Sequence, residues 1–196
     1  MDEDQQPAND YFQSLPLDYR IGSVHLLHSM QGEIVDIDTR PEVFREHVRL
    51  HLGGDLKRVV LAYFGKLMRM LGRGGFDFIG HADKISYNVS CCEPDILGQQ
   101  WYKDKISEYF TFIAEKGAMI EVNTKTLHRN GFLYPNKEHF GLIRTLGIPV
   151  VVNSDAHLPE LINSGRPEAL RLLKASGIGA VWQLERGVWT EVPIGE

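Results

Sequence analysis

Residues 150–157 read VVVNSDAH, an apolar run that ends in a carboxylate, Asp155, and an imidazole, His157. Val150 to Val152 have the β-branched side chains typical of a buried strand. Asp155 and His157 are two residues apart, so in an extended segment their side chains point to the same side. The stretch therefore predicts a strand that presents two potential metal ligands at its carboxyl end.

Strand-like and helix-like segments alternate along the rest of the chain. The predicted strands cover residues 19–27, 76–81, 118–123, 148–155, 179–184 and 186–194. The predicted helices cover residues 41–52 (with Thr39 as N-cap), 56–71, 99–117, 136–147 and 166–177. This alternation is typical of α/β proteins with a parallel sheet, either open or closed as a barrel. No internal repeat or low-complexity linker divides the sequence, so we expect a single domain over residues 1–196.

The composition is that of a globular protein and argues against several kinds of partner. The chain has 196 residues, of which 43% are hydrophobic, enough for one domain with a sizeable core. A formal net charge of -5 argues against a broad nucleic-acid-binding surface. No apolar run approaches the roughly 18 residues of a membrane span. The sequence thus predicts a protein that binds neither nucleic acid nor a membrane.

Two further features indicate the compartment. The acidic, polar start MDEDQQPAND is unlike a signal peptide. The adjacent cysteines, Cys91 and Cys92, lack the spacing of a zinc motif, and neighbouring cysteines rarely form a disulfide. Both features favour a cytoplasmic protein.

Potential metal ligands also follow or end other predicted strands. His25 ends GSVH, His81 ends FIGH, and Glu121 lies late in IEVN. Because the carboxyl ends of parallel strands lie on one face, these side chains should converge with those of Asp155 and His157. His and Asp together suit zinc, manganese or iron, so the pattern predicts a metal site at this face.

Each of these residues also has a structural interpretation. A single His at a strand end is more often a hydrogen-bonded structural residue than a ligand, and Glu121 is also suited to orienting a ligand His. The repeated occurrence at strand ends favours the metal site, because the structural interpretation must hold independently each time. His47 and His51, one helical turn apart, are interpreted as a solvated helix face, since neither follows a strand.

Four ordered blocks of the sequence resemble the histidinol-phosphatase branch of the polymerase and histidinol phosphatase (PHP) family. They are LDYRIGSVHLL, FDFIGHADKI, IEVNTKTLHRNGFLYPN and VVVNSDAH, and the resemblance runs from about Asp18 to His157. It implies an α/β fold, a distorted PHP-type (β/α)7 barrel, with up to three divalent metal ions (Zn, Mn or Fe) at its C-terminal face. It also implies hydrolysis of a small phosphorylated substrate, L-histidinol phosphate, in histidine biosynthesis.

The resemblance also implies roles for individual residues. Metal ligands of the family match His25, His81, Asp155 and His157. Asp155 and His157 are also the catalytic candidates, because a protonated group, either one of these side chains or a metal-bound water, must assist the leaving alkoxide. Arg129 matches a basic residue for the substrate phosphate, a task that suits a guanidinium fork.

The start of the family pattern has no counterpart in this sequence. The family opens with a His-x-His strand and continues to a Glu that bridges two metals, whereas Met1–Asn9 resembles the stretch just after that Glu. We therefore expect a partial barrel, incomplete at its N-terminal side, with impaired phosphatase activity. Such a chain is expected to form a homo-oligomer or to recruit a complementing N-terminal fragment.

Two other functional classes remain open at this point. One is a PHP-type phosphoesterase with another substrate, such as a nucleic-acid exonuclease. The acidic net charge disfavours it, and HRNGFLYP favours the small-molecule branch. The other is a catalytically inactive remnant that acts as a binding or structural module.

Overall fold

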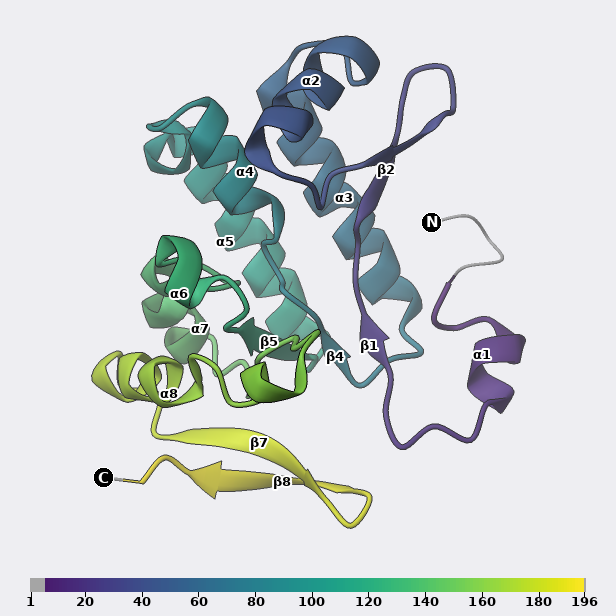
Figure 1. Ribbon diagram of the computed structural model, residues 1–196. Helices are drawn as coiled ribbons and strands as arrows, with labels where there is room; N and C mark the ends of the chain where they lie inside the picture. Colours follow the sequence, from purple (N-terminus) through teal and green to yellow (C-terminus); the bar gives the residue numbers. More distant parts are fainter. Residues whose placement is uncertain (1–5, 196) are drawn as a thin grey trace.

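A small parallel sheet organises the fold (Figure 1). The structure, a computed structural model, describes residues 6–195. The four strands of the sheet lie in the order β1-β4-β5-β6, and each neighbouring pair is parallel. Their bounds are β1 Ile21–Gly22, β4 Phe78–Ile79, β5 Met119–Asn123 and β6 Val150–Asn153. Because all four strands run the same way, their carboxyl ends meet along one edge.

Helices connect the strands of this sheet and cover it. The α-helices are α1 Asp10–Ser14, α2 Pro41–His51, α3 Leu56–Arg73, α4 Ile85–Cys92, α5 Gln100–Glu115, α6 Leu127–Asn130, α7 Phe140–Thr145 and α8 Arg166–Ala175. Short 3-10 helices cover Ile96–Gly98 (η2), Lys137–His139 (η3) and Pro159–Leu161 (η4). The two longest helices, α3 and α5, run beside each other in Figure 1 and pack together.

Local sequence explains the bounds and the packing of α3. The Asp55 side chain accepts a hydrogen bond from the Arg58 N–H at 3.0 Å, which caps the first turn. The helix ends at Gly74, whose φ of 71° suits glycine. Between these ends, the ring of Phe64 lies 5.2 Å from that of Tyr109 on α5, and both side chains are fully buried. Aromatic packing of this kind joins the two helices.

Strand β6 is apolar and buried on both faces. Val150, Val151 and Val152 are each no more than 3% exposed, and successive side chains of a strand point to opposite faces. Burial on both faces is expected of parallel strands, because the crossover helices cover both sides of the sheet. This explains why VVV at residues 150–152 is a continuous apolar run rather than an alternating one.

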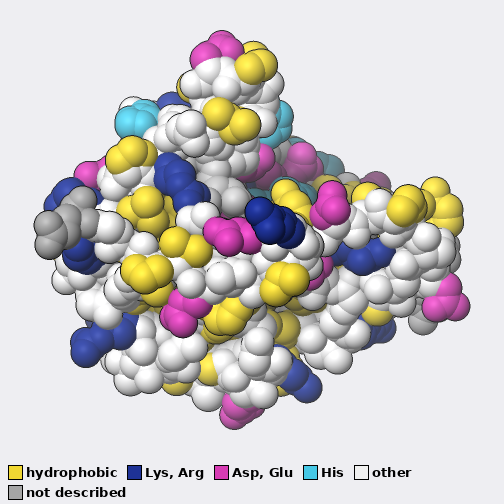
Figure 2. Space-filling model, turned by 90° about the horizontal axis from the view of Figure 1, so that it is seen from below, with side chains coloured by type: hydrophobic (Ala, Val, Ile, Leu, Met, Phe, Trp, Pro, Cys, Tyr) yellow, Lys and Arg dark blue, Asp and Glu magenta, His cyan; other side chains and the backbone are white. Residues whose placement is uncertain are grey.

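Two antiparallel hairpins complete the described part of the chain. The first pairs β2 Leu26–His28 with β3 Ile34–Asp36, and the second pairs β7 Ala180–Glu185 with β8 Val188–Pro193. Trp189 of β8 donates its indole N–H to Asp77 at 3.1 Å and lies edge-on to Phe78, which ties this hairpin to the start of β4. Seen from the side of the second hairpin, side chains of both charges are interspersed with exposed apolar ones (Figure 2).

The predicted α/β class with a parallel sheet is confirmed. Within residues 6–195 the parallel sheet is open, with β1 and β6 at its edges, so the (β/α)7 barrel and its N-terminal incompleteness stay predictions. The stretch Met1–Asn9, on which that incompleteness was argued, lies partly outside the described residues. None of the helices in the described part of the chain is long and apolar enough to cross a bilayer.

The strands predicted at residues 179–184 and 186–194 are present as β7 and β8, which pair with each other as an antiparallel hairpin. Two details of the predicted elements are wrong. Residues 19–27 do not form one strand, because the chain leaves the sheet after β1 and pairs again as β2 with β3. The N-cap of α2 is Arg40 instead of Thr39, and no side chain caps this helix. Pro41 at the first position lacks an N–H, so fewer donors need a cap there.

Candidate functional site

An open cavity of about 940 Å³ lies at the carboxyl edge of the parallel sheet. Its polar walls come from the carboxyl ends of the parallel strands, from the segments after them and from the segment after β3. The residues include His25, Asp38, His81, Glu121, Asn123, Lys125, Asn153, Asp155, His157 and Arg166. The four side chains predicted as metal ligands therefore line one cavity. Their role as ligands stays a prediction.

The main chain of His81 is held by a hydrogen bond, whereas its ring Nδ1 has no hydrogen-bond partner among the described residues. Its N–H donates to a carboxylate oxygen of Glu121 at 2.8 Å, and its φ is 33°, an uncommon value for a residue with a side chain. The ring Nδ1 is buried and has no hydrogen-bond partner among the described residues. Burial, with the nearby charges of His25 and Lys84, lowers the pKa of His81 to about 4. The imidazole is therefore neutral near pH 7.

His25 lies directly against His81. The two ring centroids are 4.7 Å apart, with the rings nearly perpendicular. The Nδ1 of His25 lies 3.1 Å from a carboxylate oxygen of Asp38, and the other oxygen of Asp38 lies 3.0 Å from the Lys84 ammonium. Burial alone would raise the pKa of Asp38, but the hydrogen bond from His25 and the charge of Lys84 outweigh it and hold this pKa below its usual range.

Asp38 is a site residue that the sequence reasoning missed. It follows β3, which is only three residues long and antiparallel, so the search for ligands after predicted parallel strands did not reach it. The available signal is the stretch EIVDID, in which an apolar pair is followed by two carboxylates at the two-residue spacing seen in SDAH. Asp38 thus joins His25 and His81 on one side of the cavity.

Asp155 and His157 form the opposite side, together with Lys125. Asp155 has a φ of 48° and accepts a hydrogen bond from the Lys125 ammonium at 3.1 Å. The same ammonium lies 3.5 Å from His157 Nε2, while His157 Nδ1 lies 2.9 Å from the main-chain oxygen of Asp155. The His157 side chain is 70% exposed, so solvent or a ligand can reach it.

Glu121 supports the site between these two sides. One oxygen of its carboxylate accepts from the His81 N–H and from Asn123 Nδ2, and the other accepts from Asn153 Nδ2. Burial raises the pKa of Glu121, and the hydrogen bonds from Asn123 and Asn153 act in the opposite direction. With both oxygens bound to protein donors, Glu121 is arranged to position β4 and His81.

The residues suit a divalent metal in chemistry, although they are not gathered into a cage. In the part of the chain that the structure describes, no group of three or more His, Cys, Asp or Glu is arranged to hold a metal ion. Asp38 and Asp155 each face an ammonium group instead. The buried Nδ1 of His81 nevertheless has no hydrogen-bond partner among the described residues, and the His81 ring lies against that of His25. A neutral imidazole of this kind is a suitable metal ligand.

The structure places Arg129 away from this cavity. Arg129 is exposed on α6 and is not among the residues that line the cavity, whereas Lys125 and Arg166 are. Arg166 donates to the main-chain oxygen of Val152 at 2.7 Å, whereas the partners of the Lys125 ammonium, Asp155 and His157, are both site residues. Lys125 was missed, although it follows β5 by two residues, as His81 follows β4 and Asp155 follows β6.

The comparisons with known proteins agree with this fold. No family model matches the chain. A curated protein of Clostridium acetobutylicum named "Probable histidinol-phosphatase" is 23% identical over 184 residues, which cover 92% of this chain and 65% of that protein. The chain thus spans slightly less than two thirds of the length of this relative.

A solved structure shows the same fold. It is the crystal structure of a protein of Listeria monocytogenes that is provisionally named a histidinol phosphatase. The TM-score is 0.67 at 23% identity, and the match covers 76% of this chain and 56% of that one. At this identity the likeness establishes a shared α/β fold.

Proposed function

We propose that the chain is a metal-dependent phosphomonoesterase of the histidinol-phosphatase type, acting on L-histidinol phosphate in histidine biosynthesis. The observation that carries the proposal is the cavity at the carboxyl edge of the sheet, to which three separate segments bring the side chains of His25, His81, Asp155 and His157. The resemblance of four sequence blocks and the names of the two similar proteins support the same reaction class.

The proposed cofactor is a divalent metal, Zn, Mn or Fe, with up to three ions per site. The residues that would hold it are His25, His81, Asp155 and His157, with Asp38 in addition. When bound, such an ion acts as a Lewis acid on phosphoryl oxygens and lowers the pKa of water. Glu121 keeps the neutral His81 ring in place through its main chain, so that little reorganisation is needed on binding.

Other residues of the cavity are assigned to the substrate. Lys125 is the cation that the structure places between Asp155 and His157, so its ammonium is suited to a phosphate oxygen. Asp155 and His157 remain the candidates that protonate the leaving alkoxide, and the exposed imidazole of His157 is the more accessible of the two. Arg129 stays a second candidate for the phosphate.

The test is a steady-state assay on the chain loaded with Mn²⁺, Zn²⁺ or Fe²⁺ in separate preparations. We expect L-histidinol phosphate to be hydrolysed faster than p-nitrophenyl phosphate, and His81→Gln to lower kcat/KM at least 100-fold. The matched control is His128→Gln, since His128 is exposed on α6 and does not line the cavity. Equal rates on both substrates, or full activity of His81→Gln, would count against the proposal.

The same assay decides between the two cations. Loss of a charge-assisted hydrogen bond to the phosphate costs about 2 kcal/mol, or roughly 30-fold in kcat/KM. If Lys125 binds the phosphate, Lys125→Met shows this loss and Arg129→Ala does not. The reverse result assigns the phosphate to Arg129, and two unchanged variants exclude both.

One observation favours the alternative of a binding module without catalysis. Lys84 and Lys125 neutralise Asp38 and Asp155, the two carboxylates that a metal would need. These ion pairs also support the expectation of impaired activity, because each ammonium must move before the carboxylate can bind an ion. A chain that binds the substrate but neither retains metal nor hydrolyses the ester would establish this alternative.

A further inference from the structure

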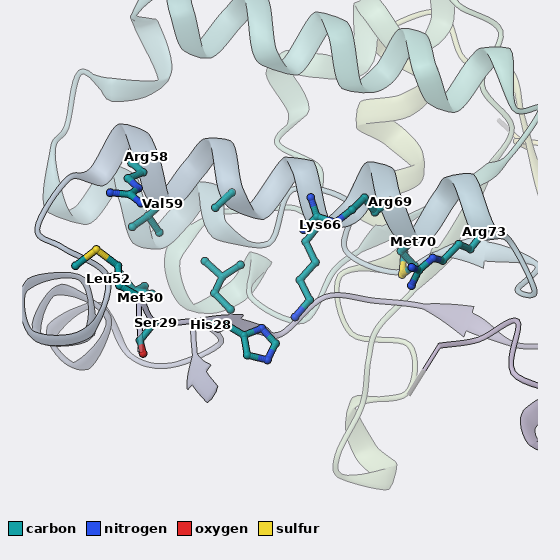
Figure 3. Close-up of a pocket in the computed structure, with 12 residues that line it drawn as sticks. His28, Ser29, Met30, Leu52, Arg58, Val59, Lys66, Arg69, Met70 and Arg73 are labelled. Atoms are coloured by element: carbon teal, nitrogen blue, oxygen red, sulfur yellow. The ribbon is translucent and has the colours of Figure 1, made fainter. Parts of the chain in front are cut away.

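A second cavity lies between α3 and the β2–β3 hairpin (Figure 3). Its volume is about 330 Å³, and it shares no lining residue with the cavity at the sheet edge. Four of its lining side chains are cationic and several others are apolar. We call it the basic pocket and define it by Arg58, Lys66, Arg69 and Arg73 with Met30, Leu52, Val59 and Met70.

The cations of the basic pocket come from one face of α3. Their spacing along the helix, from Arg58 to Lys66 to Arg69 to Arg73, keeps returning to the same side at intervals of about one or two turns. None of the lining residues is Asp or Glu. Among residues 6–195, no carboxylate pairs with the guanidinium groups of Arg58, Arg69 and Arg73. Within the described part of the chain, the pocket therefore concentrates positive charge and has no Asp or Glu in its lining.

Lys66 is the residue that distinguishes this pocket from an ordinary charged surface. Its side chain reaches from α3 towards β2, and its ammonium donates to the main-chain oxygen of Leu26 at 2.9 Å (Figure 3). Lys66 is only 8% exposed. An ammonium has three N–H donors, and burying it without a counter-ion is costly. A ligand anion would accept the donors that Leu26 does not use.

The remaining walls and the size of the basic pocket narrow the ligand class. Leu52, Val59 and Met70 are buried and Met30 is exposed, and all four line the pocket, so an apolar body would find apolar contacts there. A volume of about 330 Å³ is at the lower end of the roughly 300–1,000 Å³ typical of small-molecule sites. That space suits a compact molecule and is too small for a folded segment of protein.

We propose that the basic pocket binds a small amphipathic anion, in which one phosphate-like or carboxylate group is joined to a compact apolar body. The anionic group lies against Lys66 and Arg69, whose guanidinium can bind it in a bidentate manner. The apolar body lies against Val59, Met30 and Met70. This assignment does not depend on the chemistry at the sheet edge, because no residue is common to the two cavities.

The experiment uses methionine methyl groups as local reporters. The chain labelled with [13C-methyl]methionine is titrated with phenylphosphonate, which resists hydrolysis, and with benzoate, methylphosphonate and benzyl alcohol. Met30 and Met70 line the pocket, while Met119 of β5 does not and reports on the sheet. We expect saturable shifts at Met30 and Met70 with at least one aromatic anion, and at least tenfold weaker binding of methylphosphonate and benzyl alcohol. The relative affinity of phenylphosphonate and benzoate identifies the preferred head group.

Variants separate this pocket from other anion sites. Lys66→Gln and Arg69→Gln should each weaken binding of the aromatic anion at least tenfold. Arg69 is exposed, so its variant is expected to fold even if Lys66→Gln does not. Arg186→Gln, at an exposed arginine in the β7–β8 turn, should bind like the original chain. The proposal is overturned by the absence of saturable shifts at Met30 and Met70, by unchanged affinity in Arg69→Gln, or by equally tight binding of benzyl alcohol.

Discussion

At the scale of single residues, the candidate site depends on how Glu121 and His81 are joined. The ring Nδ1 of His81 has no hydrogen-bond partner among the described residues, but the main-chain N–H of His81 is bound to Glu121. Glu121 in turn accepts from the amides of Asn123 and Asn153, which lie on two neighbouring strands. One buried carboxylate therefore fixes the positions of three strand ends, while the imidazole stays free to bind.

This arrangement predicts the effect of Glu121→Gln. A glutamine amide has only one oxygen acceptor, so its NH₂ group would face one of the present donors and leave it unsatisfied. We expect the free energy of unfolding to fall by about 1–3 kcal/mol, measured by urea denaturation. Glu191→Gln, at an exposed position of β8, is the control and should change it by less than about 0.5 kcal/mol. Equal stability of the two variants would show that the carboxylate does not hold the strand ends.

The sequence reveals His25, His81, Asp155 and His157 because each of them follows an apolar run in a recognisable motif. It does not reveal Asp38, because the strand before it is short and pairs outside the parallel sheet. Lys125 lines the cavity because it lies two residues after the end of β5. The sequence alone does not show where β5 ends; the structure shows it once the parallel strands are aligned.

At the scale of elements, the long amphipathic helices and the inner strands were predictable, whereas α4 was not. Residues 85–92 bury polar side chains as well as apolar ones, so hydrophobic periodicity gives no helical signal there. Asn88, for example, donates to the main-chain oxygens of Ile37 and Thr39 at 3.1 and 3.0 Å. When polar side chains on a buried helix face form hydrogen bonds within the protein, that face is polar in the sequence and lacks the apolar periodicity expected of a buried helix.

The close packing of β1 against β4 leads to a prediction for the stability of the variant Gly80→Ala. A Cβ atom at Gly80, just after β4, would lie 2.6 Å from Ser23 Oγ and 2.8 Å from Ile21 Cγ2. Gly80→Ala should therefore force β1 and the following segment away from β4. We expect a loss of about 1–3 kcal/mol in the free energy of unfolding, which is typical of overpacking.

The control for this variant is Gly141→Ala in α7. A Cβ atom there meets nothing within 4 Å among the described residues, and alanine favours the helix. We expect this variant to be more stable by about 0.5–1 kcal/mol. If Gly80→Ala is as stable as Gly141→Ala, β1 does not pack on β4 as closely as described.

At the scale of the whole molecule, the open sheet leaves β1 with one strand neighbour. Within the described residues, β1 pairs only with β4, and Tyr19 and Ile21 beside this edge are 44% and 45% exposed. An apolar strand edge is a template for association with another chain. The parallel sheet followed from the alternating pattern of the sequence, but closure into a barrel depends on long-range strand pairing, which no local pattern encodes.

We therefore predict concentration-dependent self-association through the β1 edge. Ile21→Lys should shift sedimentation-velocity profiles towards the monomer, because a charge opposes pairing at an edge strand. Leu50→Lys, at an exposed position of α2, is the control and should leave the profile unchanged. A chain that is monomeric at all concentrations, or equal association of both variants, would contradict this prediction.

The central claim is that the cavity at the sheet edge holds a catalytic divalent metal, and metal retention tests it most directly. Chains dialysed against Zn²⁺ or Mn²⁺ would be analysed by mass spectrometry for bound metal, with the original chain, His81→Gln and His128→Gln measured in parallel. We predict at least one bound ion per chain in the original and in His128→Gln, and at least tenfold weaker retention in His81→Gln. Equal retention in all three chains, or no bound metal in any of them, would contradict the claim.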